Sequence, residues 1–309
     1  MISASAPAKI ILFGEHAVVY GVPAIAIPVS SLRATATVEP QAAGSGLRIH
    51  AVDTGRVLSV GLQDEVEDAL VEMAQLVLKR LHIPAPDASI TLRSDIPMAS
   101  GLGSGAAVST ALARALSSAV GKPLEAQALN ELVYEIEKRH HGTPSGIDNT
   151  VICYEQPVYF VRGEPIQPLH VGGTFHFIIA DTGQASLTKP AVAAVRALYN
   201  ENKTFVENIL HEIGKIVDEA RTALGQGDAK ALGSLMIANH ALLQSLTVSS
   251  PDLDRLVSAA LDANALGAKL SGGGRGGNMI ALADERNHDS VTAALYTAGA
   301  ARIISMTLS

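Results

Sequence analysis

The chain of 309 residues contains no tryptophan and a single cysteine, Cys153. Aromatic residues make up only 4% of it, which argues against a surface built on base stacking, as in proteins that bind single-stranded nucleic acid. One cysteine cannot form an internal disulfide and excludes a thiolate metal cluster, so a reducing, cytosolic setting is expected. Cys153 itself is interpreted as a small buried hydrophobic residue.

The sequence is also poor in basic charge and in long apolar runs. Its 23 basic residues against 30 acidic ones give a net charge of −7, the reverse of what a nucleic-acid binder needs. Apolar runs such as residues 22–29, which two prolines interrupt, fall far short of the ~20 residues that span a bilayer. The first residues lack the basic and apolar segments of a signal peptide. We therefore expect a soluble cytoplasmic protein with neither nucleic acid nor membrane as partner.

What the chain does contain is material for a large core. Hydrophobic residues make up 48% of it, mostly aliphatic and beside 27 glycines, whereas charged residues make up 17%, which excludes wholesale disorder. At ~100–200 residues per domain, this length suggests two domains or one large one. We place a boundary near residue 170, beside Gly172 and Gly173, which gives domains over residues 1–170 and 171–309.

Hydrophobic periodicity predicts mixed helices and strands in both halves. In the first half it predicts strands within 7–40 and at 89–92, helices at 64–81, 106–120 and about 125–139, and a hairpin over 151–161. In the second half it predicts strands at 175–180, 268–271, 279–282 and 301–307, with helices near 189–201, 204–224, 228–246, 251–265 and 290–298.

The strongest local signal is a glycine loop that leads into an alanine-rich helix: Ser100, Gly101, Leu102, Gly103, Ser104, Gly105 and Ala106. Glycines at alternate positions let backbone N–H groups converge on an anion, and the helix adds its positive end, so a phosphate is the natural ligand. No Gly-Lys-Ser/Thr occurs, which excludes a Walker A loop. This loop and residues 272–277 match dinucleotide fingerprints, but neither has the strand–glycine–helix order of such sites. A glycine turn that permits close packing remains the alternative for each.

A second constellation lies near the start of the chain. Lys9 heads an apolar strand, and Glu15 with His16 follows the turn residue Gly14. Taken alone, the lysine is more often a solvated strand end and the Glu-His pair a helix cap.

A third constellation pairs two carboxylates. Glu137, on a helix, precedes by one Gly/Pro loop Asp148, which follows a glycine. Near a phosphate loop, one carboxylate can hold Mg²⁺ while the other accepts a hydroxyl proton. His140 and His141 are neighbours that point different ways on a helix, so we interpret them as polar cap or substrate-side residues rather than metal ligands.

Taken together and in order, these segments resemble the signature motifs of the GHMP kinase superfamily. The motifs fall at residues 13–19, 100–107, 144–149 and 269–278, and residues 181–189 and 239–254 resemble the family's substrate-side loop and C-terminal helices. The resemblance is greatest to the branch that phosphorylates mevalonate. It implies an α+β, two-domain GHMP kinase fold, with an N-terminal ribosomal-protein-S5-like domain and a C-terminal ferredoxin-like α/β sandwich domain.

The resemblance also implies an activity, namely ATP-dependent phosphorylation of (R)-mevalonate at its 5-hydroxyl in isoprenoid biosynthesis. Asp148 is then the general base, and Lys9 stabilises charge on the attacking oxygen. Glu137 and Ser104 are the implied Mg²⁺ ligands, and residues 100–106 cradle the phosphates of ATP. The residues implied to face mevalonate are Glu15, His16 and Thr188. The turn of residues 272–277 is implied to help shape the site. A homodimer is implied as well.

Two positions depart from the family pattern. Gly105 stands where a Mg²⁺-binding serine is common, so Ser104 or water takes its place, or Glu137 carries the metal with fewer partners. Arg275 replaces a usual glycine and is either a solvated turn residue or a cation near the phosphates. The alternatives for function are a sister kinase acting on homoserine, phosphomevalonate or a sugar, a mevalonate enzyme of different regiochemistry, or a catalytically silent ATP-binding relative. Retention of Lys9 and Asp148 argues against the last.

Overall fold

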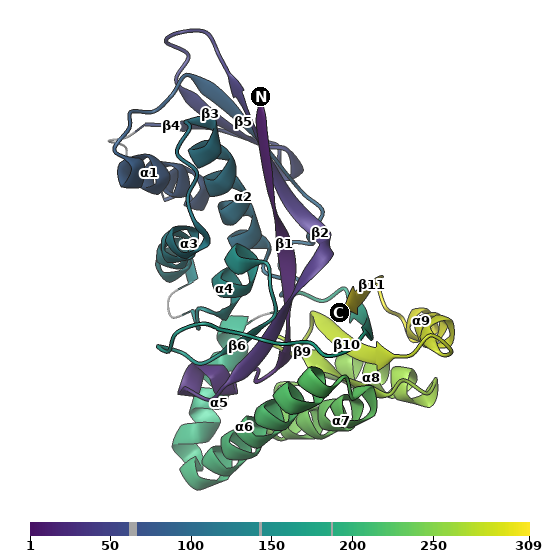
Figure 1. Ribbon diagram of the computed structural model, residues 1–309. Coiled ribbons are helices and arrows are strands. Elements are labelled where there is room, and N and C mark those ends of the chain that lie inside the picture. The colour runs from purple at the N-terminus through teal and green to yellow at the C-terminus, as the bar shows by residue number, and fades with distance from the viewer. Residues whose placement is uncertain (62–66, 142–143, 187) are drawn as a thin grey trace. The chain divides into compact units, whose positions relative to one another are not determined.

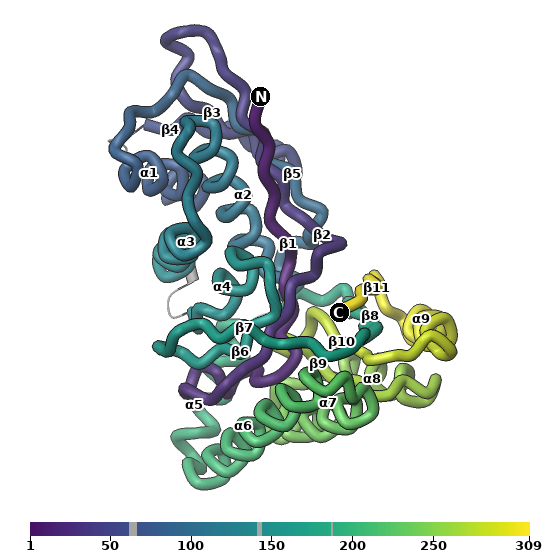
Figure 2. Tube along the Cα trace, viewed as in Figure 1, coloured from purple at the N-terminus to yellow at the C-terminus, as the bar shows by residue number. Residues whose placement is uncertain are grey.

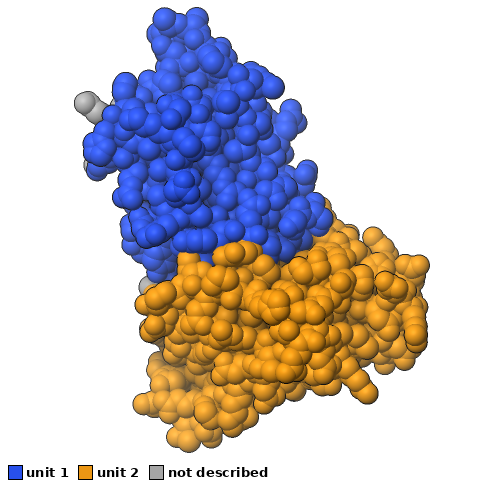
Figure 3. All heavy atoms as spheres, viewed as in Figure 1, with its two compact units in different colours: residues 1–9, 28–97, 103–155 blue, residues 10–27, 98–102, 156–309 orange. Residues whose placement is uncertain are grey.

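The computed structural model describes residues 1–61, 67–141, 144–186 and 188–309. The chain forms two compact units, coloured separately in Figure 3. Unit 1 comprises residues 1–9, 28–97 and 103–155, and unit 2 comprises residues 10–27, 98–102 and 156–309. Both units are therefore built from separate stretches of chain. The domain boundary near residue 170 stays a prediction.

A sheet covered on one face forms the framework of unit 1. Its order is β4 (Arg56–Val60), β3 (Leu47–Ala51), β5 (Ala88–Ser94) and β2 (Ala24–Pro40), and β1 (Ile2–Phe13) pairs with β2. The strand β3 lies parallel to β5, whereas β2 is antiparallel to β5 and β4 to β3. Alternate residues are buried in β5 and over residues 34–38 of β2, which is the pattern of strands with one face on the core. The alternation predicted around residues 33–38 is confirmed.

Four helices pack on the buried face of this sheet (Figure 1): α1 (Ala69–Leu81), α2 (Ser104–Ala119), α3 (Ala126–His141) and α4 (Ile147–Tyr154). Asp68 caps α1 by accepting hydrogen bonds from the backbone N–H groups of Leu70 and Val71. The predicted start of this helix, Asp64, lies outside the described residues. Alanines give α2 a slim surface, so that it packs closely against its neighbours α1, α3 and α4.

The hairpin predicted over residues 151–161 is wrong in its first half. Residues 147–154 form α4, and only β6 (Val158–Phe160) is a strand there. The β-branched run Val151-Ile152 favours a strand by propensity, but α4 is buried against α2 and α3 on nearly every side. A helix that is buried on nearly every side has no clear amphipathic period, so tertiary packing decided the conformation.

Unit 2 centres on a four-stranded antiparallel sheet in the order β11 (Arg302–Leu308), β8 (Phe175–Asp181), β10 (Asn278–Ala283), β9 (Gly267–Ser271). Its helices are α5 (Thr188–Glu201), α6 (Lys203–Gln226), α7 (Ala229–Ser245), α8 (Pro251–Asp262) and α9 (His288–Thr297). The remaining short elements of the chain are η1 (Ala17–Tyr20), η2 (Val52–Thr54) and β7 (Gln167–Pro168).

This sheet has the strand–helix–strand–strand–helix–strand succession of a ferredoxin-like unit, with several helices in the first connection. The helices α7 and α8 contact β9, α9 contacts β8 and β11, and α6 packs against α7 (Figures 1 and 2). The elements predicted for this half are confirmed. No helix among the residues described has the length and apolar character needed to cross a membrane.

Candidate active site

A buried lysine and a carboxylate form the centre of the candidate site in unit 1. Lys9 lies on β1 with its side chain only 4% exposed, and its Nζ is 2.8 Å from Oδ1 of Asp148. Asp148 is the second residue of α4, and its side chain is 37% exposed. The structure thus brings together two residues that are far apart in sequence. It leaves the carboxylate open to a ligand while the cation is shielded.

Glu137, near the end of α3, lies within the electrostatic reach of this pair. Burial and the neighbouring Asp148 carboxylate raise the pKa of Glu137 to about 7, and the Lys9 cation opposes the rise. Two carboxylates held close together beside one cation favour a second positive charge. A carboxyl group whose pKa is raised by its surroundings in this way is a candidate for metal binding.

The raised pKa of Glu137 predicts a measurable cost to stability. The folded protein keeps its proton at Glu137 up to about pH 7, whereas the unfolded chain releases it near the ordinary value of 4.5. Stability therefore falls as the pH rises between these values. We expect Glu137→Gln to raise the free energy of unfolding by about 3 kcal/mol at pH 8 without metal, and to have little effect at pH 4.5. Urea unfolding at both pH values checks this, and an equal effect at both would contradict it.

The phosphate loop reaches unit 1 at Gly103, which precedes α2. Its φ is 77°, and a Cβ there would lie 2.9 Å from Cδ1 of Ile152 and 3.0 Å from Cγ of Lys9. Only glycine fits this place, both for its conformation and for its space. Ile152 is one helical turn beyond Asp148, so the start of α2, Lys9 and α4 converge in the same part of unit 1.

The start of α2 has the features of an anion site. Among the described residues no side chain caps it, so the first N–H groups of the helix remain available to a ligand. Ser104 is half-buried and Gly105 is exposed in this first turn. The missing serine at position 105 therefore leaves an open place rather than one filled by a neighbouring side chain.

Unit 2 contains a second set of the predicted residues, organised around a buried ion pair. Glu15 and Lys269 are both fully buried, and Lys269 Nζ donates to Glu15 Oε1 and, at 2.7 Å, to the carbonyl oxygen of Leu270. Burial lowers the pKa of Lys269, and Glu15 opposes this. Lys269 was not assigned a role from the sequence; a lysine in the middle of an otherwise apolar strand is the signal that identifies it.

His16 lies beside this pair in a strained conformation, with φ at 61°. Its Nε2 is 3.0 Å from the carbonyl oxygen of Gly273, so Nε2 carries the proton and donates. Burial lowers the pKa of His16 to about 4, and the ring is neutral at pH 7. Among the described residues, Nδ1 is buried and has no hydrogen-bond partner, so its lone pair can still accept a hydrogen bond.

Three loops of unit 2 are joined by hydrogen bonds. Ser186 N donates to Ala99 O at 3.1 Å, and Asn278 Nδ2 donates to Ser100 O at 2.6 Å. Thr188 is exposed at the start of α5, and a Cβ on Gly273 would lie 2.7 Å from its Oγ1. The beginning of the phosphate loop, the substrate-side loop and the glycine turn of residues 272–277 are therefore assembled together. Leu187 lies outside the described residues.

Arg275 projects from this glycine turn and is exposed. Its Nε donates to the carbonyl oxygen of Thr247 at 3.2 Å, and its charge contributes to the low pKa of His16.

Two further residues named from the sequence lie elsewhere. Cys153 is buried, as expected, and its burial raises the pKa of the thiol to about 11. The side chain of His141 and the loop residues Gly142 and Thr143 lie outside the described residues.

A metal would have to be held jointly with a ligand. No three His, Cys, Asp or Glu side chains gather as a ready metal site in the part of the chain that the structure describes. Mg²⁺ is commonly bound by one or two carboxylates together with phosphate oxygens and water. The Glu137 carboxyl group, beside Asp148 and with a pKa raised to about 7 in the absence of a cation, fits that requirement.

Sequence models of a known family match both parts of the chain. Residues 68–156 match the GHMP kinases N terminal domain, and residues 220–301 match the GHMP kinases C terminal domain. The chain belongs to the GHMP kinase family, and the predicted two-domain GHMP kinase fold is confirmed.

The proteins most relevant to the branch of this family that the chain resembles are mevalonate kinases. The chain is 37% identical to mevalonate kinase of Thermococcus sibiricus, over 96% of this chain and 93% of that protein. It is 38% identical to mevalonate kinase of Pyrococcus horikoshii, over 96% and 92%. Among solved structures, L. major mevalonate kinase in complex with R-mevalonate has a TM-score of 0.84 and 29% identity, covering 100% of this chain and 96% of that one.

Proposed function

We propose that this protein transfers the γ-phosphoryl group of ATP to the 5-hydroxyl of (R)-mevalonate. The observation that carries the proposal is the buried Lys9 beside Asp148, next to Gly103 at the start of α2. Near-full-length similarity to mevalonate kinases supports mevalonate as the acceptor. Mg²⁺ as a cofactor, a cytoplasmic setting and a homodimer belong to this proposal and rest on the family resemblance and the composition.

The chemistry follows from what these side chains can do. The Asp148 carboxylate accepts the proton of the attacking hydroxyl, and its exposure lets the substrate reach it. The ammonium of Lys9, already 2.8 Å from Asp148, stabilises the negative charge that develops on the same oxygen. The N–H groups of the first turn of α2 bind the phosphates, with residues 100–106 as their loop. Positioning and charge neutralisation are what phosphoryl transfer requires.

Glu137 and Ser104 are the residues we assign to Mg²⁺, which supplies charge neutralisation at the phosphates when it is bound. Because Glu137 titrates near pH 7, the carboxylate is only partly ionised in the free protein at neutral pH. Binding of a cation favours the ionised form.

We assign Glu15, His16 and Thr188 to contacts with mevalonate. The neutral ring of His16 presents the lone pair of Nδ1 to a hydroxyl group, and the Lys269 ion pair fixes the Glu15 carboxylate in one position. Both groups are thus preorganised, because their hydrogen bonds within unit 2 exist before a substrate binds.

A panel of acceptors tests the proposal. We expect ATP-dependent release of ADP with mevalonate and less than one-hundredth of that rate with homoserine, phosphomevalonate or galactose. ADP release measured in a coupled assay with each acceptor checks this. Turnover of homoserine without turnover of mevalonate would assign the protein to a sister branch of kinases. No ADP release with any acceptor would indicate a catalytically silent relative that binds ATP.

A further inference from the structure

A half-buried carboxylate on α1 is bonded to the last turn of α3. Glu72 Oε2 accepts from Nη1 of Arg139 at 3.1 Å, and Glu72 Oε1 lies 3.0 Å from Nε2 of His140. The side chain of Glu72 is 15% exposed, against 52% for Arg139, so the carboxylate is the better-fixed partner. Because its two partners are consecutive residues, this bridge restrains both the position and the rotation of the helix end.

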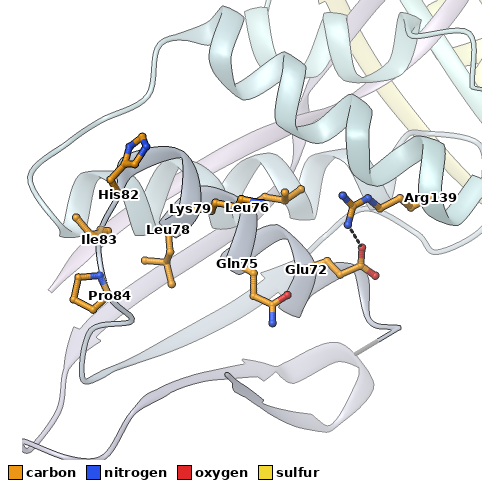
Figure 4. Close-up of a pocket in the computed structure, with 9 residues that line it drawn as sticks. All are labelled: Glu72, Gln75, Leu76, Leu78, Lys79, His82, Ile83, Pro84 and Arg139. Carbon is orange, nitrogen blue, oxygen red and sulfur yellow. Dashed lines mark hydrogen bonds and ion pairs between the residues drawn. The ribbon is translucent and has the colours of Figure 1, made fainter. Parts of the chain in front are cut away.

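A cavity of about 500 Å³ opens beside the bridge (Figure 4). Glu72 and Arg139 both line it, and Figure 4 shows the two side chains pointing toward each other from separate helices. Apart from Arg139, its walls come from α1 and the residues that follow it. Where a cavity replaces interlocking side chains, apolar contacts contribute little to holding two helices in register. The polar bridge therefore adds a restraint on the end of α3 on the side where the cavity lies.

Glu137 belongs to the same turn of α3, two residues before Arg139 and three before His140. We propose that Glu72 is a positioning residue, which fixes this turn so that the Glu137 carboxylate keeps its place near Lys9 and Asp148. The inference rests on the proposed function, in which Glu137 is a Mg²⁺ ligand. A ligand must be held to within ~0.5 Å for its metal, so loosening this turn weakens Mg²⁺ binding before it affects the acceptor.

The chain offers a matched control. Arg80 on α1 and Glu131 on α3 form a second ion pair between the same two helices, with Nη2 and Oε2 3.3 Å apart. Glu131 lies six residues before Glu137, in an earlier turn. Arg80→Ala therefore removes an α1–α3 ion pair without touching the end of α3.

The experiment compares Glu72→Ala, Glu72→Gln and Arg80→Ala with the unchanged protein. The first readout is calorimetric binding of a non-hydrolysable ATP analogue with and without Mg²⁺. We expect Glu72→Ala to reduce the gain in affinity that Mg²⁺ confers by about tenfold. The Mg²⁺ concentration for half-maximal turnover should rise similarly, with the KM for mevalonate unchanged. Glu72→Gln keeps an acceptor for Arg139 and should recover part of the loss, and Arg80→Ala should change each value by less than twofold.

Three results would overturn the inference. Equal effects of Glu72→Ala and Arg80→Ala would mean that the bridge only joins the two helices. An unchanged Mg²⁺ dependence would mean that the position of Glu137 does not depend on the Glu72 bridge. A change confined to the KM for mevalonate would mean that Glu72 acts on the binding of mevalonate. If Glu72→Ala fails to fold, Glu72→Gln is compared with Arg80→Ala instead, with a smaller loss in the same direction expected. An unchanged protein that binds no ATP analogue would instead contradict the proposed function itself.

Discussion

Replacing Asp148 with asparagine is expected to lower kcat by about 10³-fold and to leave ATP binding within about twofold. Asparagine keeps the size of the side chain but cannot accept the hydroxyl proton, and a general base contributes roughly 10²–10⁴-fold. Lys9 keeps its buried place, since the amide oxygen can still accept a hydrogen bond from Nζ. Single-turnover kinetics with saturating ATP, together with calorimetric ATP binding, measure the two effects separately.

Asp289→Asn is the control for this variant. Asp289 lies on the surface of unit 2 in the first turn of α9, and its side chain is fully exposed. It should match the unchanged protein in turnover and in ATP affinity. Unimpaired turnover of Asp148→Asn would remove Asp148 from the role of base, and loss of ATP binding with turnover preserved at saturation would place it at the nucleotide instead.

Lys9→Met should lower kcat by about 10²-fold, with a smaller loss of ATP affinity. The substitution keeps an unbranched apolar side chain in a place that is almost fully buried, but it removes the cation next to the attacking oxygen. Asp148 is 37% exposed and stays hydrated, so the fold should survive. Steady-state kinetics, with near-ultraviolet circular dichroism to verify folding, measure this.

Loss of the Lys9 charge is also expected to change the pKa of Glu137. Because the Lys9 cation lowers the pKa of Glu137, loss of Lys9 should raise that pKa from its value of about 7. The pH at which Mg²⁺-dependent activity is half-maximal should therefore move upward in Lys9→Met. Lys230→Met, an exposed position on α7, is the control and should leave kcat unchanged. A pure loss of ATP affinity in Lys9→Met, without loss of kcat, would show that Lys9 acts on the nucleotide.

Much of the site follows from local sequence. The sequence of residues 100–106 predicts an anion-binding loop, because glycine spacing and a following helix are local properties. In the structure, Gly103 directly precedes α2. The pairing of Lys9 with Asp148 came from the family resemblance, since no local pattern joins residues that are 139 positions apart. The structure places them 2.8 Å apart.

Other features depend on tertiary packing that no local pattern carries. The Glu15–Lys269 pair joins residues 254 positions apart, and each residue alone resembles an ordinary polar position. Val151 and Ile152 favour a strand by propensity, and only their packing against α2 and α3 makes this segment the helix α4. The role inferred for Glu72 likewise depends on a cavity and on two partners from another helix.

The position of the transferred phosphate tests the central claim most directly. Incubation of the unchanged protein with (R)-mevalonate, ATP and Mg²⁺, followed by phosphorus and proton NMR of the product, identifies the phosphorylated oxygen. The account predicts a phosphate coupled to the two C5 protons and consumption of one ATP per product. A phosphate on the tertiary C3 oxygen, which has no such coupling, or ADP formed without any phosphorylated mevalonate, would contradict it.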